Sequence, residues 1–111
     1  PTVLLCPGHR RLLSSQDADA LVTAFRALPQ KTLRRVVLVH GTADATVPIA
    51  DSRELAADRA RLVEVPGGSH GLGAAAADGL LSSVVLDALA KKYGLGDWGR
   101  FFCSRVSCVR L

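Results

Sequence analysis

A run of four aliphatic residues, Val36 to Val39 (VVLV), is the feature that most constrains the fold of this chain. A continuous run rich in β-branched residues is typical of a strand that is covered on both faces in a parallel sheet. Two further strands are expected at 2–6 (TVLLC) and at 62–65 (LVEV). Each of the three runs is followed by a turn signal that contains glycine, at Gly8, Gly41 and Gly67.

Helical patterns follow each expected strand. The first has capping residues at Ser15 to Asp17 and ends at Pro29. Its apolar face is formed by Leu21, Val22, Phe25 and Leu28. The second runs from Asp51 to about Arg59, and Asp51 with Glu54 has the spacing of a capping box. The third runs from Ala75 or Gly79 to Tyr93. Its buried stripe is expected to be Leu80, Leu81, Val84, Val85 and Leu89.

The order strand, helix, strand, helix, strand, helix predicts an α/β fold in three layers. About three parallel strands are joined by right-handed crossover helices. Residues 1–93 are expected to form this domain. Residues 94–111 show no clear period and remain unassigned.

Composition and charge exclude several classes of function. The net charge is +4, but the basic residues are scattered among acids, so no nucleic-acid partner is expected. No apolar run approaches the roughly 20 residues of a membrane helix, and no signal peptide is visible. Three cysteines without metal-ligand spacing predict neither a disulfide framework nor a metal or other cofactor, and a cytoplasmic location is expected.

Two strand ends carry residues suited to acid–base chemistry. Asp44 follows the second strand in HGTADATVP (40–48), and His70 follows the third in PGGSHG (66–71). Because the carboxyl ends of parallel strands form the binding edge of such sheets, the two side chains are expected to lie close together. A histidine can accept a proton from a hydroxyl and return it to a leaving group, and a carboxylate on its other nitrogen orients the ring.

These two segments resemble the end of the α/β-hydrolase superfamily. The similarity covers about residues 33–93 and is carried by VVLVHGTADATVP and RLVEVPGGSHG. It implies that Asp44 is the acid and His70 the base of a catalytic triad in a serine hydrolase. The implied substrate is a small-molecule or peptide ester, thioester or amide, and no cofactor is needed.

The nucleophile of that triad is the missing part. Residues 67–71 (GGSHG) match the G-x-S-x-G pattern, but the family order is Ser, Asp, His, and no histidine follows His70. Ser69 is therefore interpreted as a small loop residue. Because the chain begins with Pro1 and not Met, it is expected to be a processed product, an excised segment or an incomplete gene model, and alone a poor hydrolase.

The other candidate residues have structural interpretations. The first strand is either the family's strand before the acid-bearing one, or an earlier strand that supplies an oxyanion-hole amide. His9 and His40 are interpreted as structural histidines and Cys6 as a core residue. Cys103 and Cys108 match no thiol or metal motif.

Two functions from other classes stay open. The chain could be a non-catalytic, hydrolase-like interaction module that pairs with a partner through an open sheet edge. It could also be a small anion-binding domain whose Gly67–Gly73 loop lacks the lysine of a phosphate loop.

Overall fold

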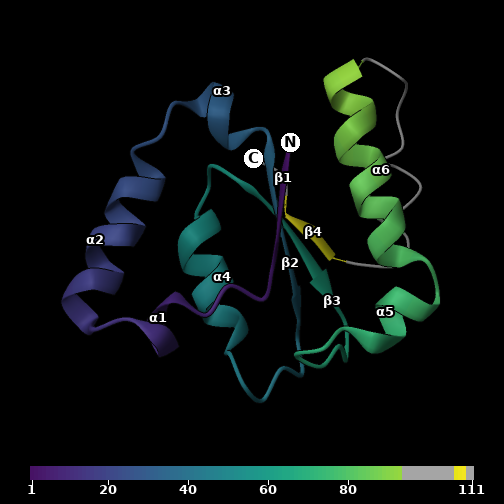
Figure 1. Ribbon diagram of the computed structural model, residues 1–111, viewed down its shortest axis with the longest axis horizontal. Helices are drawn as coiled ribbons and strands as arrows, with labels where there is room; N and C mark the ends of the chain where they lie inside the picture. Colours follow the sequence, from purple (N-terminus) through teal and green to yellow (C-terminus); the bar gives the residue numbers. More distant parts are fainter. Residues whose placement is uncertain (94–106, 110–111) are drawn as a thin grey trace.

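The computed structural model describes residues 1–93 and 107–109. These residues form strands and helices whose arrangement is shown in Figure 1. In chain order the elements are β1 (Thr2–Leu5), α1 (His9–Leu12), α2 (Ser15–Arg26), α3 (Gln30–Leu33), β2 (Val36–Gly41), α4 (Ile49–Ala56), β3 (Arg61–Val65), α5 (Gly73–Ala77), α6 (Leu80–Tyr93) and β4 (Ser107–Val109).

The sheet has the strand order β1-β2-β3-β4. β1 pairs in parallel with β2, and β2 in parallel with β3, where Gly41 lies opposite Val65. The three-stranded parallel sheet predicted from the sequence is therefore confirmed. β4 adds an antiparallel strand beside β3. It lies within the segment 94–111, for which no structure was predicted from the sequence.

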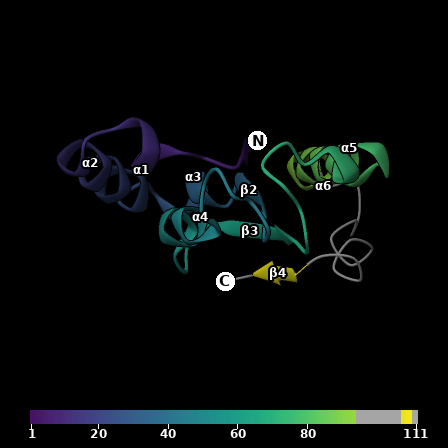
Figure 2. The ribbon, with the colours of Figure 1, turned by 90° about the horizontal axis from the view of Figure 1, so that it is seen from below.

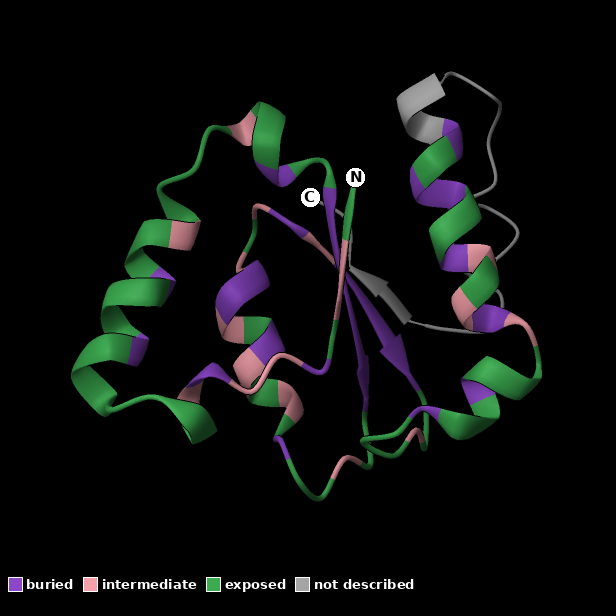
Figure 3. Ribbon diagram, in the orientation of Figure 1, coloured by how far each residue is buried: buried purple, intermediate pink, exposed green. Residues whose placement is uncertain are grey.

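Helices cover both faces of the sheet. Alternate residues of β2 point to opposite sides, so Val36 and Leu38 belong to one core cluster and Val37 and Val39 to another. The first cluster packs under α2 and α4, and the second under α5 and α6. Figures 1 and 2 show the two helical groups on opposite sides of the strands, and Figure 3 shows β2 and β3 buried between them. The result is a three-layer α/β arrangement.

The helix starts differ from the sequence prediction. Ser14 caps α2, since its side chain accepts a hydrogen bond from the Asp17 backbone N–H at 3.1 Å. The predicted capping box at Asp51 is wrong, because α4 begins earlier, at Ile49, with no side-chain cap. Glu54 is not available to complete a cap, since its carboxylate binds residues of another helix.

The ends and faces of the other predicted helices also need correction. The third helix is two helices, α5 and α6, separated at Gly79, which has a φ of 83°. Four of the predicted core residues are exposed, and small residues of the same helices, such as Ala18 and Ala88, are buried instead. The exposed four are Leu21, Leu28, Val85 and Leu89. Alanine lets a helix approach the sheet closely, which turns larger neighbours outward.

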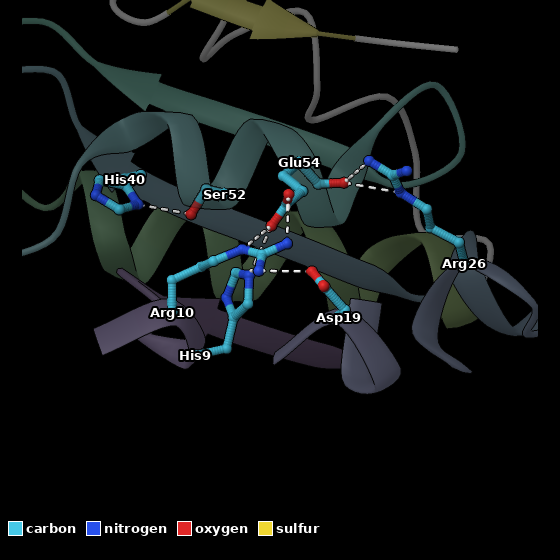
Figure 4. A network of polar contacts seen from close by, with 7 residues as sticks. All are labelled: His9, Arg10, Asp19, Arg26, His40, Ser52 and Glu54. Carbon is cyan, nitrogen blue, oxygen red and sulfur yellow. Dashed lines mark hydrogen bonds and ion pairs between the residues drawn. The ribbon is translucent and has the colours of Figure 1, made fainter. Parts of the chain in front are cut away.

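A polar network connects the helices of one layer (Figure 4). The Arg10 guanidinium donates two hydrogen bonds of 2.8 Å to the Glu54 carboxylate of α4, and it also pairs with Asp19 of α2 at 2.7 Å. The His9 ring contacts Glu54 at 3.1 Å. Bonds from Arg10, and next from His9, lower the pKa of Glu54 to about 2. The network thereby joins α1, α2 and α4 around one ionised carboxylate.

No described helix combines the length and the apolar character that crossing a lipid bilayer requires.

Candidate active site

The loop after β2 holds Asp44 in a fixed, buried position. The Asp44 backbone N–H donates to the Gly41 carbonyl at 3.3 Å, which closes a turn directly after the strand. One carboxylate oxygen of Asp44, Oδ1, accepts hydrogen bonds from the backbone N–H groups of Thr46 and Val47, both at 2.8 Å. The side chain is fully buried. Asp44 therefore organises its own loop, as aspartates in turns commonly do.

The loop after β3 is joined to the loop after β2 by backbone contacts. The Ala43 N–H donates to the Gly68 carbonyl at 3.0 Å, and the Thr42 N–H to the Val65 carbonyl at 3.0 Å. The Gly67 N–H returns a bond of 2.8 Å to the Thr42 hydroxyl.

Gly41 and Gly68 allow the close approach of these loops. A Cβ built on Gly41 would lie 2.9 Å from the Gly68 Cα and nearer still to the Gly68 carbonyl. Gly67 has a φ of 68°, a conformation that favours glycine. Two glycines predicted to mark turns, Gly41 and Gly67, thus act together with Gly68 to let the two loops pack closely.

This arrangement brings Asp44 and His70 into direct contact. His70 Nδ1 lies 2.9 Å from Asp44 Oδ2. Because the carboxylate can only accept, Nδ1 donates, and Nε2 is the acceptor nitrogen of the neutral ring. The Asp44 side chain is inaccessible, whereas 47% of the His70 side chain is exposed. The geometry is that of a buried acid orienting a solvent-reachable imidazole.

Hydrogen bonding keeps Asp44 ionised. Burial alone raises the pKa of this carboxyl, but the bonds from the Val47 N–H, the His70 ring and the Thr46 N–H act in the opposite direction and outweigh it. The net effect places the pKa of Asp44 well below its usual range. At neutral pH Asp44 is therefore a carboxylate that accepts hydrogen bonds rather than a proton donor.

A second histidine contacts the same carboxylate. His40 is fully buried in β2, and its Nε2 lies 2.8 Å from the Val47 carbonyl and 3.2 Å from Asp44 Oδ2. Its Nδ1 lies 2.6 Å from the Ser52 hydroxyl (Figure 4). Since the Val47 carbonyl only accepts, Nε2 carries a proton. His40 thus bonds locally, as its sequence position suggested.

Cys6 completes the surroundings of Asp44. It is 6% exposed and follows β1 with a φ of 44°. Its thiol donates to the backbone carbonyl of His70 at 3.5 Å, not to the ring. Burial and the neighbouring Asp44 raise the pKa of this thiol, and the bond to the Gly41 backbone only partly offsets them. Sequence reasoning placed Cys6 in the core but had no signal for its contact with the site, nor for Ser52.

Ser69 lies beside the site without joining it. In the described part of the chain no hydrogen bond connects its hydroxyl to the His70 ring, and its carbonyl accepts from the Leu72 N–H at 3.1 Å. A hollow of about 260 Å³ opens between the loop after β3 and the start of α6. Ser69 and Asp78 supply the polar side chains of its lining.

Comparisons with protein-family models, with curated proteins and with solved structures found no match to this chain. The side-chain geometry is therefore the basis for the functional conclusion.

Proposed function

We propose that this chain is the acid–base part of a serine hydrolase with a partial α/β-hydrolase fold. Its reaction is the hydrolysis of a carboxylic ester, thioester, amide or peptide bond. The observation that supports this most directly is the 2.9 Å contact between His70 Nδ1 and a buried Asp44 carboxylate whose other oxygen is held by two backbone N–H groups.

In this proposal each residue has one role. His70 Nε2 takes the proton of an attacking hydroxyl and later delivers it to the leaving group. Asp44 fixes the tautomer of the ring through Nδ1 and stabilises the imidazolium that forms between the two steps. The low pKa of Asp44 supports this division, since the carboxylate holds its charge while the ring changes protonation.

The nucleophile is proposed to come from another strand beside β1. β1 is an edge strand in the described sheet. The backbone N–H groups of Thr2 and Cys6 bond at 2.8 and 2.9 Å to the carbonyls of Arg35, just before β2, and Val39, within β2. In a parallel pair the backbone groups of Val3 and Leu5 then point to the free side. A strand added there in parallel would end at the same edge as Asp44 and His70.

A fluorophosphonate probe tests this function. We expect the complete gene product to react with it, and His70→Ala to abolish the labelling, because the hydroxyl loses its base. Asp44→Asn is expected to reduce labelling, and Ser69→Ala, the matched control in the same loop, to leave it unchanged. Equal labelling with and without His70 would contradict the assignment of the base. Loss of labelling in Ser69→Ala would make Ser69 the nucleophile.

The 111 residues alone provide a second test. We expect no burst of acyl-enzyme with an activated ester, because the base then has no hydroxyl to act on. A burst that needs both Ser69 and His70 would show that the chain is a complete catalyst.

The outer edge of β1, which pairs with no described strand, also supports a non-catalytic alternative. Leu5 on this edge is 53% exposed, and an unpaired edge is a template for strand addition. As an interaction module, the chain would bind its partner equally well with and without His70. A pull-down with wild-type chain and His70→Ala, combined with the probe experiment, separates the two functions.

A further inference from the structure

Three metal-ligating side chains from separate positions in the sequence meet beside the acid–base pair. They are Cys6 at the end of β1, His40 in β2 and Asp44 in the following loop, and their ligand atoms all lie within 4.8 Å of one another. Thiolate, imidazole and carboxylate are the ligands of protein-bound Zn²⁺. With bonds of about 2.0–2.3 Å, a tetrahedral Zn²⁺ holds its ligand atoms roughly 3.3–3.8 Å apart. The observed 3.2 Å between His40 Nε2 and Asp44 Oδ2 is close to that spacing.

The His40 ring can present the required nitrogen. Its Nε2 now donates to the Val47 carbonyl, but Nδ1 lies 2.6 Å from the Ser52 hydroxyl, which can accept a hydrogen bond as well as donate one. If the ring proton moves to Nδ1, Ser52 accepts it, and Nε2 can bind a metal once the Val47 carbonyl, which now occupies its in-plane direction, gives up its bond to the ring. Histidine ligands in metal sites typically donate their other N–H to such an oxygen.

The charges of the cluster suit a divalent cation. A Cys6 thiolate and the Asp44 carboxylate together neutralise a charge of +2, and His40 binds as a neutral ring. Cys6, His40 and the Asp44 side chain are all at least nine-tenths buried, so an ion there is largely shielded from solvent. A buried charge is tolerated only when it is paired or coordinated, and this set provides the pairing.

We propose that Cys6, His40 and Asp44 form a binding site for Zn²⁺ or a cation of the same class. On binding, the Cys6 thiol proton is released to solvent, and the His40 ring proton moves from Nε2 to Nδ1. Three protein ligands leave a fourth position, and His70 Nδ1, at 2.9 Å from Asp44 Oδ2, is the nearest imidazole to it.

The cation and the acid–base pair use the same carboxylate oxygen. A metal bound through Asp44 Oδ2 replaces the hydrogen bond that orients His70, or takes Nδ1 of that ring as its fourth ligand. In either case His70 loses its orienting carboxylate. The inhibitory consequence rests on the proposed hydrolase function, whereas the binding site itself does not.

Cobalt binding by the metal-free chain tests the site without any substrate. We expect Co²⁺ to bind in a ratio of one to one with the visible bands of tetrahedral coordination and a thiolate charge-transfer band, and Zn²⁺ to displace it. Cys6→Ser should remove the charge-transfer band and weaken binding at least tenfold. The double variant Cys103→Ser/Cys108→Ser is the matched control and should bind as the wild type does.

Several results would overturn the proposal. They are a charge-transfer band that persists in Cys6→Ser, a band that disappears in the Cys103/Cys108 double variant, and an absence of tetrahedral Co²⁺ in the wild type. Should Cys6→Ser fail to fold, Ser52→Ala keeps the test decisive. Loss of the Ser52 hydroxyl, which accepts the hydrogen bond from His40 Nδ1 in the metal site, should weaken Co²⁺ binding roughly 10–100-fold. An unchanged affinity would refute the site.

The inhibitory step is measured separately in the complete gene product. Zn²⁺ should suppress fluorophosphonate labelling of the wild type, and Cys6→Ser should resist it. If Co²⁺ binds through Cys6 but no protein is labelled even without metal, the hydrolase proposal fails and the metal site stands. If labelling requires His70 but no Co²⁺ binds, the metal site fails alone.

Discussion

Replacing Gly41 by alanine should separate the two loops that form the site. The new Cβ would lie 2.9 Å from the Gly68 Cα and closer still to the Gly68 carbonyl, whereas carbon atoms in contact normally stay about 3.5–4.0 Å apart. The opposing group is backbone, so no side chain can rotate away. The loops must therefore part by roughly 0.5–1 Å or more to restore that contact distance.

The energetic cost follows from two effects. Overpacking of this kind typically costs about 1–3 kcal/mol. The movement also weakens the 3.0 Å hydrogen bond from the Ala43 N–H to the Gly68 carbonyl, which contributes about 1 kcal/mol. We expect Gly41→Ala to lower the free energy of unfolding by about 2–4 kcal/mol, a large part of the ~5–15 kcal/mol typical of natural proteins.

Urea denaturation followed by circular dichroism measures this loss. With a slope near 2 kcal/mol per molar, the midpoint should fall by roughly 1–2 M. Gly71→Ala is the matched control in the same region, since its Cβ would meet nothing within 4 Å, and its free energy of unfolding should change by less than about 0.5 kcal/mol. Equal midpoints for the two variants would show that the contact between Gly41 and Gly68 does not hold the loops together.

Three further variants test other parts of the fold by the same denaturation method. The pKa of Glu54 is about 2 in the folded protein against a usual 4.5, so its ionised form contributes stability above pH 4.5 that is lost as the pH falls toward 2. Glu54→Gln should flatten this decline in the free energy of unfolding. Parallel plots of that free energy against pH for the wild type and the variant would contradict it. Leu38→Ala in the buried sheet should cost about 2–5 kcal/mol, against less than about 0.5 kcal/mol for the 81% exposed Leu12→Ala. Thr42→Val removes the acceptor of the Gly67 N–H and should cost about 0.5–1.5 kcal/mol; an unchanged midpoint would exclude that bond as a contributor.

The parallel sheet was predictable because its signal is local. Every residue of β2 is buried, as the run VVLV indicates for a strand between two helical layers. The start of α4 was not predictable in the same way. Asp51 and Glu54 have the spacing of a capping box, but Glu54 instead binds Arg10, which is 44 residues away. β4 has only three residues, too few for a periodic pattern to identify.

The candidate site was also predictable only in part. The contact of Asp44 with His70 followed from the rule that parallel strands end at one edge, which requires no knowledge of packing. The positions of Cys6 and Ser52 could be predicted only with knowledge of the packing. Cys6 turns toward Asp44 through a positive φ, and Ser52 reaches His40 only because α4 packs against β2. No spacing in the sequence contains that information.

The surroundings of Asp44 also indicate which of its two histidines would act as the base in the proposed function. Both nitrogens of His40 have partners, and the ring is fully buried, so a second ring proton would leave a charged group that only Asp44 can balance. His70 uses only Nδ1 on Asp44, and nearly half of its side chain reaches solvent. A proton taken up at its Nε2 is stabilised by the carboxylate on one side and by water on the other. Under the proposed function, His70 is therefore the ring that exchanges the proton, and His40 is a buried neighbour of the carboxylate.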